Sequence, residues 1–147
     1  MIEFDLVHSD IENPTTFSRE DIADFLHEHL DEYGYEKKHI LSSIAYAYGD
    51  EEGQDGFILV AHDKDQIVGA VIINHTNMGG FIPEHILVYI AVHGDYRGEG
   101  LGKELMERII EATEGDIALH VEPDNPAKYL YEKYGFTNKY LEMRLSK

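Results

Sequence analysis

The sequence contains no cysteine and no tryptophan among its 147 residues. The absence of cysteine excludes disulfides, a thiol nucleophile and thiolate ligands for a metal. The sequence also has no apolar run close to the roughly 18 to 20 residues of a membrane span. Its N-terminus lacks the basic and then apolar pattern of a signal peptide. We therefore expect a cytoplasmic protein that does not associate with membranes.

Basic residues are scarce, because only 12 lysines and arginines stand against 29 aspartates and glutamates, for a net charge of −17 at pH 7. Lysine and arginine supply most of the affinity for phosphate backbones, so we expect no nucleic-acid partner. The charge is uneven: residues 1–96 carry −15 and residues 97–147 carry −2. The nearly neutral part suits an anionic cofactor and the acidic part a cationic substrate. Carboxylates that serve only solubility or adaptation to salt explain the same pattern.

Length and a hydrophobic share of 43% predict one globular domain over residues 1–147. Apolar periodicity predicts the order β-α-α-β-β-β-α-β-α-β, with strands at residues 2–7, 57–61, 67–73, 86–92, 117–121 and 140–145. After a turn at Asn13, the first helix is expected to start with a capping box of Ser18 and Asp21 and to end near Gly34. The second helix is expected over about 36–48.

The segment 92–103 joins a buried apolar strand to an amphipathic helix. The buried face of that helix is predicted by the spacing of Leu101, Leu105, Ile109 and Ala112. Glycines at the junction let the backbone adopt left-handed conformations and let a ligand approach the amides. The first N–H groups of a helix point outward at the positive end of its dipole. The junction therefore predicts a site for a phosphate or pyrophosphate.

Two better-known phosphate motifs do not fit this junction. The P-loop pattern needs glycine where Arg97 stands and serine or threonine where Glu104 stands. The dinucleotide fingerprint is one residue longer than the segment 98–102. What remains is Arg-x-x-Gly-x-Gly after a buried strand. This arrangement resembles the acyl-CoA-binding motif of the GCN5-related N-acetyltransferase (GNAT) superfamily.

A second motif supports the same resemblance. The segment 125–136 contains Asn, Ala, Leu-Tyr and Gly-Phe in the order found in that family, after a predicted strand. Asn125 is expected to cap a short helix that opens at Pro126 and ends at Gly135. The resemblance is strongest over 86–136. It implies an α/β fold of one acyl-CoA N-acyltransferase domain, with a mixed sheet of about six or seven strands and about four helices. In that fold the fourth and fifth strands splay apart where the cofactor enters.

The resemblance implies acetyl-CoA as co-substrate, attacked directly by an amine without an acyl-enzyme intermediate. The pyrophosphate would be held, largely by main-chain N–H groups, at Arg97, Gly98, Gly100, Gly102 and Lys103. The pantetheine arm would pair with the main chain of Ile90, Ala91 and Val92 and be reached by Asn125. The thioester carbonyl would lie against an N–H group near Val92.

Tyr131 stands where the family places the general acid that protonates the leaving thiolate. Two other tyrosines, Tyr129 and Tyr134, share its short helix. Aromatic side chains on a helix often serve packing alone, so packing is the alternative role for Tyr131. Only Tyr131 occupies the family position.

The general base is expected at His120, where some family members place a basic or acidic group. Alternation along the predicted fifth strand places Glu122 on the same face. Glu84 and His85, before the central strand, are alternatives, and a purely structural role is the alternative interpretation of His120. None of the nine histidines shows H-x-x-x-H or H-E-x-x-H spacing, so we predict no metal site.

The acceptor is expected to be a cationic primary amine, such as a polyamine, an aminoglycoside-like compound, or a lysine or N-terminal amine. The carboxylates between Glu20 and Glu36 would recruit it. A transferase for another acyl-CoA and a non-catalytic acyl-CoA-binding sensor are the competing interpretations. The family includes both monomers and dimers, so a homodimer is compatible with the resemblance.

Overall fold

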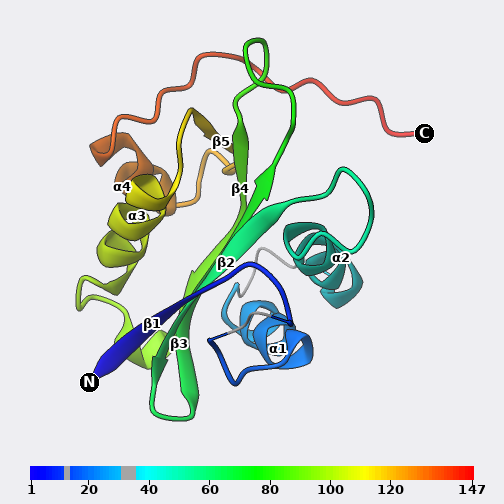
Figure 1. Cartoon of the computed structure of the whole chain (residues 1–147). Helices are drawn as coiled ribbons and strands as arrows, with labels where there is room; N and C mark the ends of the chain where they lie inside the picture. The colour runs from blue at the N-terminus through cyan, green and yellow to red at the C-terminus, as the bar shows by residue number, and fades with distance from the viewer. Residues whose placement is uncertain (12–13, 31–35) are drawn as a thin grey trace.

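A computed structural model describes residues 1–11, 14–30 and 36–147 of the chain (Figure 1). Along these ranges the elements are β1 (Ile2–Val7), α1 (Arg19–His29), α2 (Lys37–Ala47), β2 (Gly56–Asp63), β3 (Gln66–His75), β4 (His85–Val92), the 3-10 turn η2 (Gly94–Tyr96), α3 (Leu101–Ala112), β5 (Ile117–Leu119) and α4 (Ala127–Lys133).

The strands form one mixed sheet in the order β1-β2-β3-β4-β5. The first four strands pair with one another in antiparallel fashion, and β5 runs parallel to β4. The predicted mixed α/β architecture is confirmed, including β1 as an edge strand and the β2–β3 hairpin. Within the described ranges the sheet has five strands, so the expected count of six or seven is wrong.

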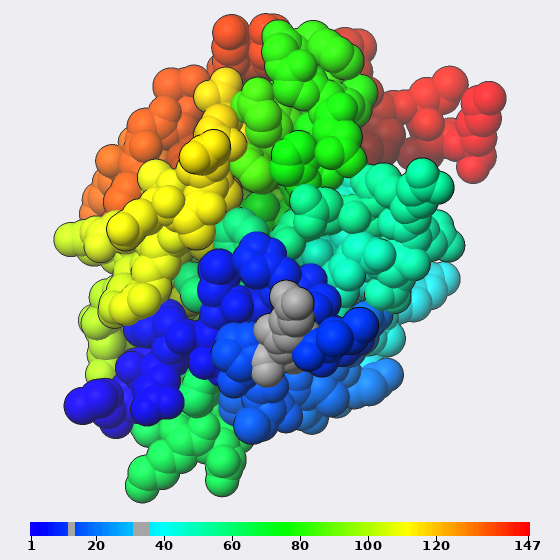
Figure 2. Space-filling view, in the orientation of Figure 1, coloured from blue at the N-terminus to red at the C-terminus, as the bar shows by residue number. Residues whose placement is uncertain are grey.

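The strand predicted over 140–145 is not formed. Residues 141–147 adopt no regular secondary structure, and the apolar side chains from Tyr140 to Leu145 are 79–91% exposed. In Figure 2 this C-terminal segment projects from the body of the molecule. β5 has only three residues, so it offers a sixth strand too short an edge to pair along.

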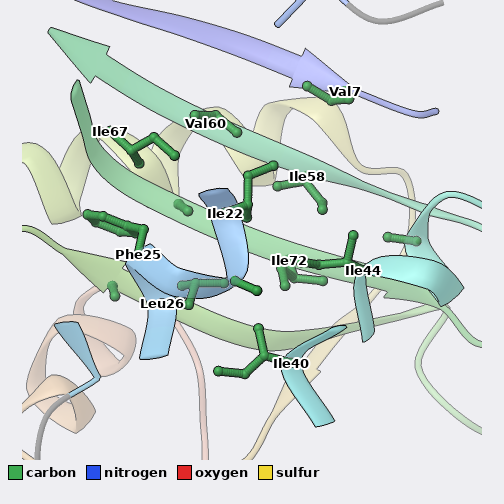
Figure 3. Packing of buried hydrophobic residues seen from close by; sticks show 14 of the residues in the cluster. Val7, Ile22, Phe25, Leu26, Ile40, Ile44, Ile58, Val60, Ile67 and Ile72 are labelled. Atoms are coloured by element: carbon green, nitrogen blue, oxygen red, sulfur yellow. The ribbon is translucent and has the colours of Figure 1, made fainter. Parts of the chain in front are cut away.

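Helices cover both faces of the sheet, with α1 and α2 on one side and α3 and α4 on the other (Figure 1). Under α1 and α2, aliphatic side chains such as Ile22, Leu26 and Ile44 pack on the sheet (Figure 3). Strand β3 is apolar on both faces, because Ile72 belongs to this core and Ile73 to the opposite one. A strand buried on both faces explains the continuous apolar run in the sequence.

The helix boundaries follow local signals in most places. The Ser18 and Asp21 side chains form the predicted capping box at the start of α1. That helix ends at His29, before the predicted end near Gly34, and Gly34 and the predicted turn at Asn13 lie outside the described residues. On α3 the prediction for Ala112 is wrong, since it is exposed and Met106 is buried instead. Ala112 is the last helical residue, beyond the turns that cover the sheet.

Candidate active site

Strands β4 and β5 separate after a short paired segment. β5 pairs only with residues 85–87 of β4, so among the described residues no strand lies against the β5 side of Val88 to Val92, although β3 still pairs with the other side of the strand. The N–H of His93 donates to the main-chain oxygen of Val68 in β3 (2.8 Å). Because main-chain groups alternate in direction along an antiparallel strand, the N–H groups of Ile90 and Val92 face the open side. This open edge can pair with an extended ligand.

A break in the β3–β4 register coincides with the point of separation. The register shifts between Ile72 and Ile73, and Val88 has no partner in β3. Val88 and Tyr89 therefore both pack toward the α1 and α2 face, whereas Leu87 packs toward α3. Such irregularities re-aim side chains and are frequent beside active sites. The bulge was not predicted, because apolar residues occupy every position of the strand.

The loop before α3 depends on two glycines with left-handed backbone. Gly98 and Gly100 have φ angles of 81° and 83°, and an added Cβ at either would meet no atom within 4 Å. Conformation and not space therefore requires glycine there. Gly100 is the N-cap of α3 and supplies no side-chain hydrogen bond to the first turn. The first N–H groups of α3 therefore have no side-chain cap, and helix N-termini of this kind can bind an anion.

Gly102 differs, because it lies within α3, where an added Cβ would lie 3.6 Å from a methyl group of Leu130 in α4. This close approach seats α4 beside the first turn of α3. The hydroxyl of Tyr134, the residue that follows α4, donates to the main-chain oxygen of Lys103 (3.2 Å). The Lys103 side chain itself is exposed beside the helix start.

Arg97 connects two distant elements. Its Nε donates to the main-chain oxygen of Val92 (3.2 Å) and its Nη2 to that of His29 (2.9 Å). The segment between β4 and α3 also contacts α1 at Gly94, whose N–H donates to Nδ1 of His29 (3.4 Å). The end of α1 is therefore tied to the end of β4. Sequence reasoning missed these contacts because His29 lies 68 residues from Arg97 and carries no motif.

Tyr131 is the inward-facing tyrosine of α4. It is 7% exposed and its ring lies 5.9 Å from that of Phe136, between centroids. Tyr129 is 69% exposed, and the Tyr134 hydroxyl is bonded to Lys103 and Glu107. Asn125 accepts a hydrogen bond at Oδ1 from the N–H of Ala127 (2.9 Å). The N-cap of α4 is Pro126, so the helix begins one residue later than predicted and Asn125 precedes its cap.

His120 is exposed and follows β5 instead of lying within it. The predicted strand face shared by His120 and Glu122 is therefore wrong, because β5 ends at Leu119. The alternative base Glu84 accepts a hydrogen bond from the N–H of Asp116 (2.7 Å). This bond and further backbone N–H groups lower the pKa of Glu84, which makes it a weaker base.

His85, the other alternative base, is anchored at the start of β4. Its Nε2 donates to the main-chain oxygen of Glu114 (2.8 Å), since a carbonyl oxygen only accepts. That bond fixes Nδ1 as the unprotonated nitrogen of the neutral ring. Nδ1 is buried without a hydrogen-bond partner among the described residues.

The carboxylates predicted to recruit the acceptor are partly engaged elsewhere. Lys37 lies 2.6 Å from Glu20 and 2.8 Å from Asp24, and Asp21 belongs to the capping box. A hollow of about 410 Å³ between α1 and the β2–β3 hairpin is nevertheless lined by Asp21, Asp24, Glu28 and Asp65. Asp31 and Glu32 lie outside the described residues.

A second hollow, of about 260 Å³, lies between α2 and the start of β4 and includes Val88 in its lining. No described helix is long and apolar enough to cross a membrane. In the same ranges no group of three or more histidine, aspartate or glutamate side chains is arranged to hold a metal.

A family profile described as "Acetyltransferase (GNAT) domain" matches residues 54–138, which is more than half of the chain. The matched segment contains the open β4 edge, the glycine loop and α4. It is the part of the chain on which the two sequence motifs lie.

Among curated proteins, the chain is 34% identical over 84 residues to 5-NmdU N-acetyltransferase of Pseudomonas phage PaMx11, covering 56% of this chain and 58% of that protein. It is 35% identical over 60 residues to the cysteine-rich protein 2-binding protein of Mus musculus, covering 40% of this chain and 8% of that protein. The chain thus spans only part of the length of these relatives.

Among solved structures, aminoglycoside N-acetyltransferase AAC(6')-Iy in complex with CoA is similar with a TM-score of 0.69 at 13% identity. The match covers 100% of this chain and 95% of that one. At this identity the likeness concerns the fold.

Proposed function

The chain belongs to the GNAT acetyltransferase family, and from that premise we propose that it transfers the acetyl group of acetyl-CoA to a primary amine. The observation that carries the proposal is the open edge of β4, followed across the glycine loop by the N-terminus of α3, which has no side-chain cap. An extended arm ending in a pyrophosphate matches both features in one ligand.

The proposed cofactor site follows the chain from strand to helix. The main chain of Ile90 and Val92 pairs with the pantetheine, and Ala91 between them keeps its own pairing with Ala70 in β3. The pyrophosphate lies against the N–H groups from Gly98 to Lys103, with the Lys103 ammonium nearby. Arg97 positions this loop through its bonds to Val92 and His29. The amide of Asn125 reaches the pantetheine from the start of α4.

In the proposed reaction the amine nitrogen attacks the thioester carbonyl carbon, and the negative charge that develops on oxygen is stabilised by an N–H of the open β4 edge. The carbon–sulfur bond then breaks and the CoA thiolate takes the proton of Tyr131. A phenol with a pKa near 10 is a weaker acid than a thiol near 8.5, so this transfer accompanies collapse of the intermediate. The proton lost by nitrogen passes to His120 through water.

For the acceptor we propose a primary amine that is cationic in solution. The acidic part of the chain, and the hollow lined by Asp21, Asp24, Glu28 and Asp65, support attraction of a cation. We further propose that residues 1–147 act as one acetyltransferase domain.

The test is release of free thiol from acetyl-CoA in the presence of polyamines, lysine peptides, amino acids and aminoglycosides. A protein without cysteine adds no thiol background. We expect release with at least one amine class and none with acetyl-CoA alone. If no amine causes thiol release although acetyl-CoA binds, the protein would be a transferase of another acyl group or a non-catalytic binding protein. If acetyl-CoA does not bind, the proposed cofactor site is refuted.

A further inference from the structure

We propose that the hollow between α2 and the start of β4 is the acceptor pocket and that it selects amines carried on an apolar stem, such as alkylamines and lysine side chains, over hydroxyl-rich amino sugars. This inference rests on the proposed function and narrows its acceptor class.

The hollow holds about 260 Å³ and its floor and rim come from four segments. Tyr46 of α2 faces the end of β3 at residues 74–76, with Met78 of the following loop beside it, and Ile86 and Val88 of β4 complete the lining. Ile86 is 40% exposed and Met78 is 43% exposed. Apolar surface is therefore open to solvent in a concave site, where an apolar ligand group gains by covering it.

Most of the polar side chains of the lining make hydrogen bonds within the protein. The Tyr46 hydroxyl donates to the main-chain oxygen of His75 (2.9 Å), and Nδ1 of His75 accepts from the N–H of Asn77 (3.0 Å). Thr76 donates to the main-chain oxygen of Pro83 (2.8 Å) and accepts from the N–H of Met78 (3.2 Å). When the Asn74 side-chain amide is oriented to satisfy its hydrogen bonds, its nitrogen donates to the main-chain oxygens of Ser43 and Ile73.

Several hydroxyls on one ligand would therefore find few partners in the hollow, and each hydroxyl left unbonded costs free energy. None of the described lining residues carries a carboxylate, so the site offers no counter-ion to a second ammonium group. An apolar surrounding also favours the uncharged amine over the ammonium ion. The uncharged amine is the form that attacks a carbonyl carbon.

The hollow adjoins the proposed reaction centre. Val88 lines it and is also the first residue of β4 beyond the pairing with β5. Ile90, whose N–H faces the open edge, lies two residues further, about 6 to 7 Å along the strand. A stem seated on Ile86 and Val88 thus brings its amine next to the open edge.

The acidic hollow stands at the other end of β3. It includes Asp65 and Gln66 at the hairpin turn, eight or more residues from the end of β3, which is roughly 25 Å along a strand. Its carboxylates can attract a cation from solution but do not contact an amine seated beside Val88.

The test compares kcat/KM for n-hexylamine and Nα-acetyl-lysine amide with that for kanamycin, together with calorimetric titration of n-hexylamine into protein saturated with CoA. We expect at least ten-fold higher kcat/KM for the two stem amines. Met78→Asp, in a loop, and Ile86→Asp are each expected to lower kcat/KM for n-hexylamine at least ten-fold without changing acetyl-CoA affinity. The control Ile110→Asp changes a similarly exposed isoleucine of α3 and should leave both unchanged.

A preference for kanamycin, or stem-amine turnover that is insensitive to both pocket variants, would overturn the inference and leave the proposed function standing. If no amine releases thiol, the proposed function fails and the titration decides the inference. Binding of n-hexylamine that Met78→Asp abolishes would support the pocket, and absence of binding to the wild type would overturn it.

Discussion

At the level of single residues, Gly100 and Gly102 at the start of α3 have different roles. Gly100 has left-handed backbone, which costs an alanine about 1 to 2 kcal/mol. Gly102 has ordinary helical backbone and room for a Cβ at van der Waals distance, and a helical glycine is about 0.5 to 1 kcal/mol less favourable than alanine. We predict that Gly100→Ala lowers the free energy of unfolding in urea and that Gly102→Ala maintains or raises it. Equal losses in both variants would contradict this distinction.

Tyr131 offers a test of chemistry separate from packing. Tyr131→Phe removes one oxygen from a buried ring, so we expect the fold and the acetyl-CoA affinity to persist. Loss of a general acid typically lowers turnover by about 10² to 10⁴-fold, and we predict a fall of kcat in that range. Tyr129→Phe, on the same helix but exposed, is the matched control. Full activity of Tyr131→Phe would leave Tyr131 as a packing residue.

Single residues with local roles could be predicted from sequence. Ser18 caps its helix as expected because capping involves partners within three residues. The hydrogen bonds of Glu84 with Asp116 and of Arg97 with His29 could not be predicted from sequence, because these partners lie 32 and 68 residues apart. Distant pairs depend on how elements pack, and no local pattern encodes that.

At the level of elements, Glu84 joins the entrance of β4 to the turn before β5. Its folded-state pKa is lowered, first by the N–H of Asp116. A carboxyl with a lowered pKa stabilises the fold above its unfolded pKa, which is about 4.3 for glutamate, and this stability is lost as pH falls through the folded pKa. We therefore predict that the wild type loses stability below about pH 4 more steeply than Glu84→Gln.

The measurement for Glu84 is the thermal midpoint between pH 7 and pH 3. Glu111→Gln, an exposed change on α3, serves as the control and should follow the wild-type curve. Parallel curves for the wild type and Glu84→Gln would show that the contact with Asp116 contributes nothing that depends on charge.

Arg97 links α1, β4 and the glycine loop. Its hydrogen bonds should therefore contribute to stability and to acetyl-CoA binding beyond the contribution of its positive charge. We predict that Arg97→Ala lowers the free energy of unfolding by about 1 kcal/mol and weakens acetyl-CoA binding. Arg97→Lys keeps the charge but cannot span two carbonyl oxygens in the same way. Calorimetry should find both variants similarly weakened, whereas recovery in the lysine variant would indicate a direct charge contact with the pyrophosphate.

The order and type of the helices and strands were predictable from the apolar pattern of the sequence, and nine of the predicted segments form the expected element. Strand ends were less predictable. β5 ends at Leu119 although apolar Val121 follows, since pairing with β4 stops there. The strand expected at 140–145 had only weak alternation and found no adequate edge.

At the scale of the whole molecule, the sheet separates the family motifs from the two hollows. The family motifs lie on the α3 and α4 face, and both hollows lie on the α1 and α2 side. The splay between β4 and β5 is where ligands from the two sides can meet. The hollows were not predictable from sequence, because each is built from segments that are distant along the chain.

The charge of the whole chain makes a further prediction. If the net charge of −17 attracts a cationic acceptor, raising salt from 50 to 500 mM should raise the KM for that amine several-fold, because the Debye length shortens well below about 10 Å. The turnover number should change little, since we propose that the reacting amine is seated in an apolar pocket. A KM independent of salt would assign the acidic surface to solubility alone.

The most direct test of the central proposal is to follow an isotopically labelled acetyl group from acetyl-CoA in the presence of a stem amine. Mass spectrometry would locate the label after turnover by the wild type and by Tyr131→Phe. We predict the label on the amine nitrogen, at a rate that falls with Tyr131→Phe and persists with Tyr129→Phe. Label found only in free acetate, or retained in unreacted acetyl-CoA, would contradict acetyl transfer to an amine.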